Sequence, residues 1–161
     1  MRFPLREEKS REVGDWTRDS SPPLPGVGFR VEIDGITQAG FTDATIPDST
    51  TDPVEYREGT DPVHGRKLSG QTKYGNITLK WGLTDSMDLY NWRKQVIEKG
   101  ASKAKKNLSL VLVDEEGSDK ARWNAMDAWP TKYDCTDFAA KGAEVLIESL
   151  DLVCEEVVRV Q

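Results

Sequence analysis

Hydrophobic and polar residues alternate over several segments of the chain, the pattern typical of β-strands with one buried face. The clearest case is the segment in which Ile77, Leu79 and Trp81 alternate with polar neighbours. Similar strand patterns occur at residues 29–34, 54–56, 108–113, 120–129 and 145–154. The parity of the apolar positions changes near Glu148 and Ser149, which predicts a β-bulge there.

One segment has helical periodicity, and it predicts a helix over residues 85–99. Thr84 or Asp85 is the expected N-terminal cap, and Gly100 is the expected stop. The apolar residues of this helix form two adjacent lines, one of Leu89, Trp92 and Val96 and a second of Met87, Tyr90 and Ile97. A stripe of this width predicts that the helix packs on a sheet.

Turn signals separate the predicted strands. The Asp34-Gly35 dipeptide predicts a tight turn in a β-hairpin that opens the fold. Residues 47–52 and 57–66 are polar, and we expect them to form long loops around a short strand. Loops of this length are uncommon in compact domains and tend to be functional.

The strand predicted at residues 108–113 carries apolar side chains on both faces. Such a strand needs a partner on each face, which a closed barrel or a neighbouring subunit can supply. Val111 and Val113 are therefore candidates for a lateral subunit interface. Trp123 and Trp129 lie on a strand whose two faces cannot both be internal, and tryptophan is favoured at subunit contacts. Core packing and a subunit contact therefore remain equal alternatives for them.

Length and charge narrow the range of functions. A chain of 161 residues fits one domain, which we place at residues 27–161, after an extended, charged and proline-rich arm at residues 1–26. The net charge of −6 argues against general nucleic-acid binding. Apolar runs are too short to span a bilayer, and the charged N-terminus does not resemble a secretory signal, so we expect synthesis in a cytoplasm.

The sequence contains few residues that are candidates for catalysis or for binding a metal or cofactor. The single histidine, His64, lies in a polar segment, and Cys135 and Cys154 are too far apart for a close-spaced zinc motif, so we expect no metal site and two buried free thiols. No phosphate-binding glycine motif occurs, and we expect no cofactor. The carboxylates at residues 114–116 are expected in a solvated turn, and the lysines at residues 99–106 at a helix end and linker. We therefore predict no enzyme.

Six motifs occur in the order seen in a known family: FRVEIDG (29–35), YREG (56–59), KYGNITLK (73–80), RWN (122–124), AWP (128–130) and the segment 144–152. With these motifs the chain resembles the tail-tube (inner tube) proteins of contractile phage tails, R-type pyocins and extracellular contractile injection systems. It departs from them at Ser69, where a proline commonly precedes Gly70, and in its longer arm.

The resemblance implies a mainly β fold, a two-sheet antiparallel β-barrel or sandwich with one flanking α-helix. It also implies sixfold rings that stack into a hollow tube, with a contractile sheath around it, baseplate, spike and cap proteins at its ends, and protein or DNA cargo in its lumen. Assembly would take place in a bacterial cytoplasm. The family's extended loop reaches the adjacent ring, which assigns the ring-to-ring contact to Tyr56, Arg57, Glu58 and Gly59.

Three alternatives to a main tube subunit remain open at this stage. The chain could be a tube-initiating homologue near the baseplate, because its arm is unusually long. It could be a carrier or effector-binding β-barrel that works as free rings. A small hydrolase is the third alternative, although the sequence offers no nucleophile and base pair.

Overall fold

The chain folds into two antiparallel β-sheets and a helical segment in the computed structural model, which describes residues 28–36, 40–60, 63–138, 142 and 146–161. The arm predicted at residues 1–26 lies outside the described residues. The elements are β1 (Gly28–Ile33), β2 (Phe41–Ala44), β3 (Ser49–Tyr56), β4 (Arg66–Tyr74), β5 (Ile77–Gly82), α1 (Asp88–Lys99), α2 (Ala101–Ala104), β6 (Lys106–Val113), β7 (Asp119–Cys135), β8 (Ile147–Val153) and β9 (Glu156–Arg159). The predicted mainly β class is confirmed.

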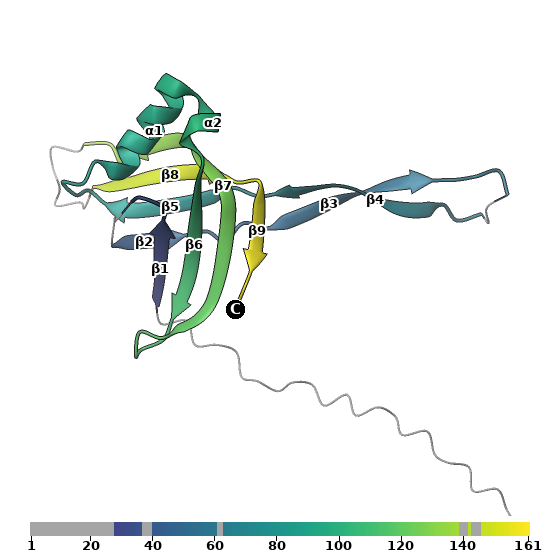
Figure 1. The fold of residues 1–161 in the computed structure, drawn as a ribbon, viewed down its shortest axis with the longest axis horizontal. Coiled ribbons are helices and arrows are strands. Elements are labelled where there is room, and N and C mark those ends of the chain that lie inside the picture. Colours follow the sequence, from purple (N-terminus) through teal and green to yellow (C-terminus); the bar gives the residue numbers. More distant parts are fainter. Residues whose placement is uncertain (1–27, 37–39, 61–62, 139–141, 143–145) are drawn as a thin grey trace, which may run out of the picture.

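The long strand β7 belongs to both halves of the main sheet (Figure 1). Its first half pairs with β6 and β9, and its second half pairs with β8. Strand β1 extends the first half beyond β6, and β5 and β2 extend the second beyond β8. At Asp127, between the two halves, the backbone has a φ of 51°, a left-handed conformation that is uncommon outside glycine.

The core lies between these two halves and is built from the alternating strands that the sequence predicted. Ile77 and Leu79 are fully buried and Trp81 is 2% exposed. They pack with buried residues of the other strands, including Val31, Leu108, Leu110, Leu150 and Leu152. Each strand contributes every second residue, as the pleat of a β-strand requires.

Helix α1 covers one end of the core (Figure 1). Leu89 and Trp92 are buried and Val96 packs against the core. The indole of Trp92 donates a hydrogen bond to the carbonyl of Ala104 in α2, at 2.6 Å. Gly100 ends α1 with a φ of 85°, as expected for a glycine stop.

Two expectations about this helix are wrong. It begins at Asp88, and neither Thr84 nor Asp85 caps it, because no side chain bonds its first turn. The hydroxyl of Thr84 instead accepts a bond from the backbone of Ser86. The second apolar line is largely exposed, since Met87 is 55% and Ile97 68% exposed, and only Tyr90 of this line has a ring contact with the sheet, at Tyr133.

The first hairpin and the bulge were also wrongly predicted. The turn at Asp34-Gly35 forms, but β1 pairs with β6 and β2 pairs with β5 in the other half of the sheet. Strand β8 pairs with β5 without a register shift at Glu148. An irregularity lies in β7 instead, between Pro130 and Lys132.

Strands β3 and β4 form an extended β-hairpin that projects away from the rest of the molecule (Figure 1). The first polar segment predicted as a loop lies largely in β3, whereas residues 57–60 and 63–65 of the second lie between the two strands, as predicted. Every residue of β3 is exposed. The two strands are held to each other by backbone pairing and by cross-strand contacts such as the 2.8 Å hydrogen bond between the Thr51 and Thr72 hydroxyls. Among the described residues, no helix is long and apolar enough to span a membrane.

Candidate assembly surfaces

The β3–β4 hairpin is highly exposed, since every residue of β3 and most residues of β4 face solvent. In the described part of the molecule its strands pair only with each other. Val54 and Leu68 are direct cross-strand partners and remain 51% and 53% exposed. An isolated two-stranded hairpin is at best marginally stable in water. The hairpin therefore presents apolar surface suited to contact with another molecule.

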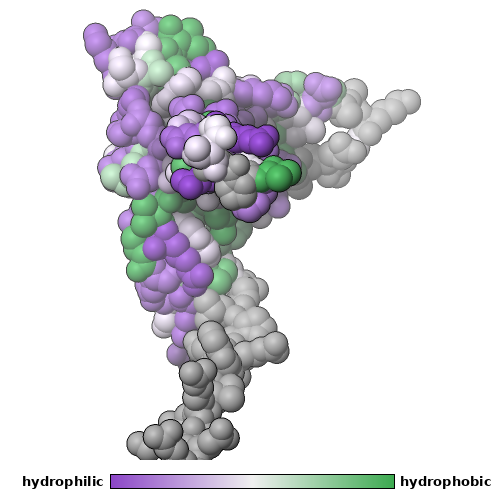
Figure 2. Space-filling model, turned by 90° about the vertical axis from the view of Figure 1, so that its right-hand side faces the viewer, coloured by the Kyte–Doolittle hydropathy of each residue, from purple (hydrophilic) through white to green (hydrophobic). Residues whose placement is uncertain are grey.

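The far end of the hairpin carries the residues assigned from the sequence to ring-to-ring contact. Tyr56 ends β3, and Arg57, Glu58 and Gly59 follow it, all of them exposed. The Tyr56 hydroxyl donates to the Glu58 carboxylate at 2.5 Å, and this hydrogen bond raises the pKa of Tyr56. Figure 2 looks at the molecule from the side of the hairpin and shows a mixed surface, with hydrophobic areas below the hairpin.

The position of Val111 argues against its assignment to a lateral interface. Strand β6 lies between β1 and β7 and is not an outer strand. Val111 is only 1% exposed, so its side chain offers almost no surface to a neighbouring subunit. Val113 is half-buried at the end of the same strand. Strands β1 and β9 are the outer strands beside β6 and β7, each paired on one side among the described residues.

Four charged side chains form a network on the face of the sheet that carries Val111. In cross-strand register, Val111 lies between Arg30 on β1 and Arg122 on β7. Arg30 bonds Glu32 at 2.9 Å and Asp119 at 3.1 Å, and Arg122 bonds Glu32 at 3.1 Å. Burial alone would raise the pKa of Glu32, but the bonds from Arg122 and Arg30 outweigh it and lower that pKa.

Trp123 and Trp129 are both half-buried, so neither is wholly a core residue. Trp123 packs against the core on one side, and the Arg159 guanidinium lies 5.4 Å from its ring centre. Trp123 also lines an apolar groove of about 310 Å³ with Phe29, Ala44, Ile46, Leu110, Val111 and Leu112. Phe29 is 38% and Ile46 46% exposed, so the groove opens to the surface.

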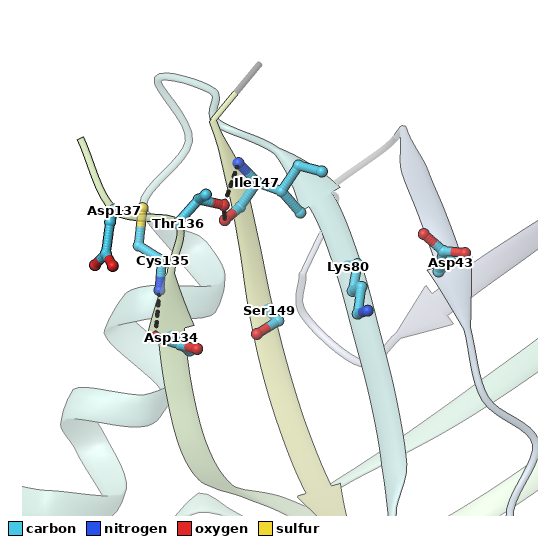
Figure 3. Close-up of a pocket in the computed structure, with 8 residues that line it drawn as sticks. All are labelled: Asp43, Lys80, Asp134, Cys135, Thr136, Asp137, Ile147 and Ser149. Atoms are coloured by element: carbon cyan, nitrogen blue, oxygen red, sulfur yellow. Dashed lines mark hydrogen bonds between the residues drawn. The ribbon is translucent and has the colours of Figure 1, made fainter. Parts of the chain in front are cut away.

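A polar face lies on the other half of the sheet (Figure 3). Asp43, Lys80, Ser149 and Asp134 follow one another across four adjacent strands, in direct cross-strand register. They border an open hollow of about 550 Å³, to which Cys135 also contributes. Its charges alternate in sign across the strands, an arrangement that suits a solvated surface.

Metal and thiol chemistry find little support in the described residues. His64 is exposed, and no group of three potential metal ligands is found among them. Cys135 and Cys154 are free and half-buried, less buried than expected. Burial raises the pKa of the Cys154 thiol, which makes it less reactive.

In the turn after β6, the bonds from Lys120 and the Ser118 backbone lower the pKa of Asp114.

Sequence reasoning missed one polar site completely. Glu148 is buried at 7% exposure, and its carboxylate accepts hydrogen bonds from the Trp81 indole at 2.7 Å and from the Tyr133 hydroxyl. Glu148 has the same parity along β8 as Leu150 and Leu152, and that register is the signal that could have identified it as inward-facing.

Solved structures with this fold include components of contractile injection systems. A chain of the cryo-EM structure of the anti-feeding prophage cap (AFP tube terminating cap) is 29% identical, with 86% of this chain and 91% of that chain covered and a TM-score of 0.72. A chain of the PVC sheath-tube complex of an extracellular contractile injection system, in the extended state, is 25% identical, with coverages of 86% and 92% and a TM-score of 0.74.

More distant structures share the fold alone. Hcp1 from Flavobacterium johnsoniae is 16% identical over 82% of this chain and 94% of that chain, with a TM-score of 0.54. A search of curated proteins gives no match. The family model described as T4-like virus tail tube protein gp19 matches residues 25–158, which confirms the resemblance drawn from the sequence motifs. The chain therefore belongs to the T4-like virus tail tube protein family.

Proposed function

We propose that this protein is a structural subunit of the hollow inner tube of a contractile injection system or phage tail. Six copies form a ring, and rings stack into a tube that conducts cargo. The match of the tail tube family model to residues 25–158 carries this proposal. Its similarity to a chain of a sheath-tube complex supports it further.

Lateral assembly has a physical basis in the outer strands. Strands β1 and β9 present backbone groups that the described chain leaves unpaired on one side, and such edges pair readily with another strand. Val158 on β9 is 41% exposed and Val160 beyond it 53%. We assign the lateral interface to these edges, together with Val113, Trp123 and Trp129, and no longer to Val111. A head-to-tail contact of this kind closes into a ring when its rotation is suitable.

Stacking of rings is assigned to the hairpin. Tyr56, Arg57, Glu58 and Gly59 at its far end would contact the adjacent ring, supported by the exposed Val54 and Leu68. This placement explains why a two-stranded hairpin extends from the molecule with no covering element among the described residues. Contacts built from exposed apolar and charged side chains are typical of non-obligate interfaces.

The proposed partners follow from the same assignment. A contractile sheath would surround the tube, baseplate or spike proteins and a cap would close its ends, and protein effectors or DNA would pass through its lumen. Assembly would take place in the bacterial cytoplasm. The role is structural, without catalysis.

Electron microscopy of the purified full-length protein tests the proposal. We expect negative-stain images to show rings of six subunits, and tubes with a continuous lumen at higher protein concentration. A protein that stays monomeric at all concentrations, in its native particle lysate as well as alone, would contradict the proposed role.

A second candidate is a homologue located at one end of the tube. It is favoured by the 29% identity to a chain of the AFP tube terminating cap structure. Antibody labelling of native particles separates the two functions. Label along the whole tube supports the main subunit, whereas label at one end supports the tube-end homologue.

A further inference from the structure

A small cavity lies where the start of α1 meets the second half of the sheet. It encloses about 210 Å³ and is lined by Trp81, Leu83, Thr84, Ser86, Met87, Leu89, Tyr90, Tyr133 and Glu148. This volume is below the ~300 Å³ at which sites for drug-sized ligands begin, so it fits a single side chain.

The lining of the cavity includes one carboxylate, that of Glu148. Glu148 is 7% exposed, and its two hydrogen-bond donors, Trp81 and Tyr133, are both uncharged. Burial, followed by the bond to Glu148, raises the pKa of Tyr133, so this residue stays a neutral donor. A carboxylate has about four acceptor positions, and these two bonds leave room for more.

Among the described residues, no ion pair joins the Glu148 carboxylate to a cationic side chain. None of the described residues that line it is lysine, arginine or histidine. The adjacent exposed residues Asp85 and Asp88 are acidic and add to the negative potential at its mouth. A buried charge is costly unless it is paired, so the site favours a cation supplied from outside.

The walls suit the aliphatic stem that carries such a cation. Tyr90 packs edge-on against Tyr133 with ring centres 5.4 Å apart. Leu83 and Met87 at the opening are 51% and 55% exposed. Aromatic faces attract cations, and apolar rims cover the methylene groups of lysine and arginine.

We propose that this cavity binds a lysine or arginine side chain presented by another protein, with Glu148 as its ion-pair partner. The net charge of −6 on this chain favours a basic partner surface. Arginine would add bidentate bonding and stacking, whereas lysine would bind as a point charge.

The probes are N-acetyl-arginine methylamide and N-acetyl-lysine methylamide, added to the full-length protein. The uncharged norleucine analogue is the control for hydrophobic binding, and matched sodium chloride is the control for ionic strength. A ligand that binds the folded state raises its Tm. At tenfold excess over Kd we expect a rise of about 3–6 °C for a charged probe and none for norleucine. The stronger of the two charged probes identifies the preferred side chain.

A charge-matched pair of variants completes the test. Glu148→Gln keeps the shape and an acceptor oxygen but removes the charge, and we expect at least tenfold weaker binding. Asp134→Asn removes one negative charge from the exposed face of the same sheet, outside the cavity, and we expect unchanged binding. Met87→Ala and Tyr90→Ala alter exposed rim residues and should weaken binding severalfold without loss of fold.

The proposal is overturned if Glu148→Gln binds the charged probes as well as the wild type does, or if norleucine binds equally well. The assay needs neither rings nor tubes, so its outcome is separate from that of the proposed tube function.

Discussion

Trp81 and Glu148 face each other as direct cross-strand partners on β5 and β8, and the indole N–H donates to the carboxylate at 2.7 Å. Both side chains are buried, at 2% and 7% exposure. The bond links two strands of the sheet that carries the core residues Leu79 and Leu150, which are also cross-strand partners. A buried polar group in this position must be satisfied, because an unpaired one costs about 1–3 kcal/mol.

Replacing Glu148 by alanine should therefore destabilise the protein strongly. The change leaves the Trp81 N–H and the Tyr133 hydroxyl without their acceptor, and we expect a loss of about 2–5 kcal/mol in the free energy of unfolding. Glu148→Gln retains one acceptor oxygen and should cost only about 1–2 kcal/mol. Urea denaturation followed by tryptophan fluorescence measures both. Equal losses in the two variants would show that the hydrogen bonds contribute little.

Substitutions at Val111 and Val158 should affect different properties, stability in the first case and assembly in the second. Val111→Ala removes buried methyl groups, so we expect it to lower the free energy of unfolding by about 1–3 kcal/mol and to leave assembly intact. Val158→Asp alters an exposed residue of the outer strand β9, so we expect a normal unfolding curve but few rings. Denaturation and size-exclusion chromatography make the comparison. Normal ring formation by Val158→Asp would remove β9 from the lateral interface.

The parts of the fold that sequence predicted best are those whose side chains pack against the core. Ile77, Leu79 and Trp81 alternate because one face of β5 is buried, and α1 was recognised from Leu89 and Trp92 for the same reason. Hydrophobic periodicity reports burial directly. It does not report partner choice, which is why the Asp34-Gly35 turn was found but the pairing of β1 with β6 was not.

The two main errors have a common physical cause. The first half of β3, at residues 49–52, has no buried face, so its polar sequence carries no alternation and was predicted as a loop. At Glu148, a buried polar residue occupies an inward position, so the strand seemed to change parity and a bulge was predicted. Both elements are stabilised by specific hydrogen bonds, such as that between Thr51 and Thr72, which a hydrophobic pattern does not record. Residues 56–59 lie at the far end of the hairpin. Their proposed contact with an adjacent ring forms only in an assembled tube.

Acid should weaken the charge network around Glu32. Its folded-state pKa is lowered from an ordinary value of 4.5, so the stabilisation is present above pH 4.5 and is lost as pH falls through the lower folded value. The effect should be modest, because the carboxylate is 43% exposed. Denaturation at pH 7 and at pH 3–4 should show a smaller loss of stability for Glu32→Gln than for the wild type. Identical pH profiles would exclude a contribution from this residue.

The left-handed backbone at Asp127 should restrict which residues the bend in β7 accepts. A β-branched residue is strained at a φ of 51°, so Asp127→Val should cost about 1–2 kcal/mol. Asp127→Asn is the matched control, because asparagine tolerates this conformation and only the charge is lost. Its stability should stay close to that of the wild type. Thermal unfolding compares them, and a larger loss in Asp127→Asn would assign the effect to charge.

The hairpin end offers the direct test of ring stacking. Arg57→Glu and Glu58→Arg each reverse an exposed charge at the proposed contact with the adjacent ring. Exposed charge changes seldom cost a domain much stability, so both variants should fold and form rings. Because the reversed charge would meet an unaltered partner surface, the rings should stack poorly and negative-stain images should show single rings with few tubes.

A charge reversal elsewhere shows whether the effect is local. Lys94→Glu changes an exposed residue on α1, outside the hairpin, which forms a 3.8 Å ion pair with Glu98. This variant should form tubes of normal length, since a surface pair at that distance contributes little. Hairpin variants that form equally long tubes would show that residues 56–59 face solvent in the assembled particle. Shortened tubes in all three variants would assign the effect to surface charge in general. Only a defect confined to Arg57→Glu and Glu58→Arg supports the hairpin as the axial contact.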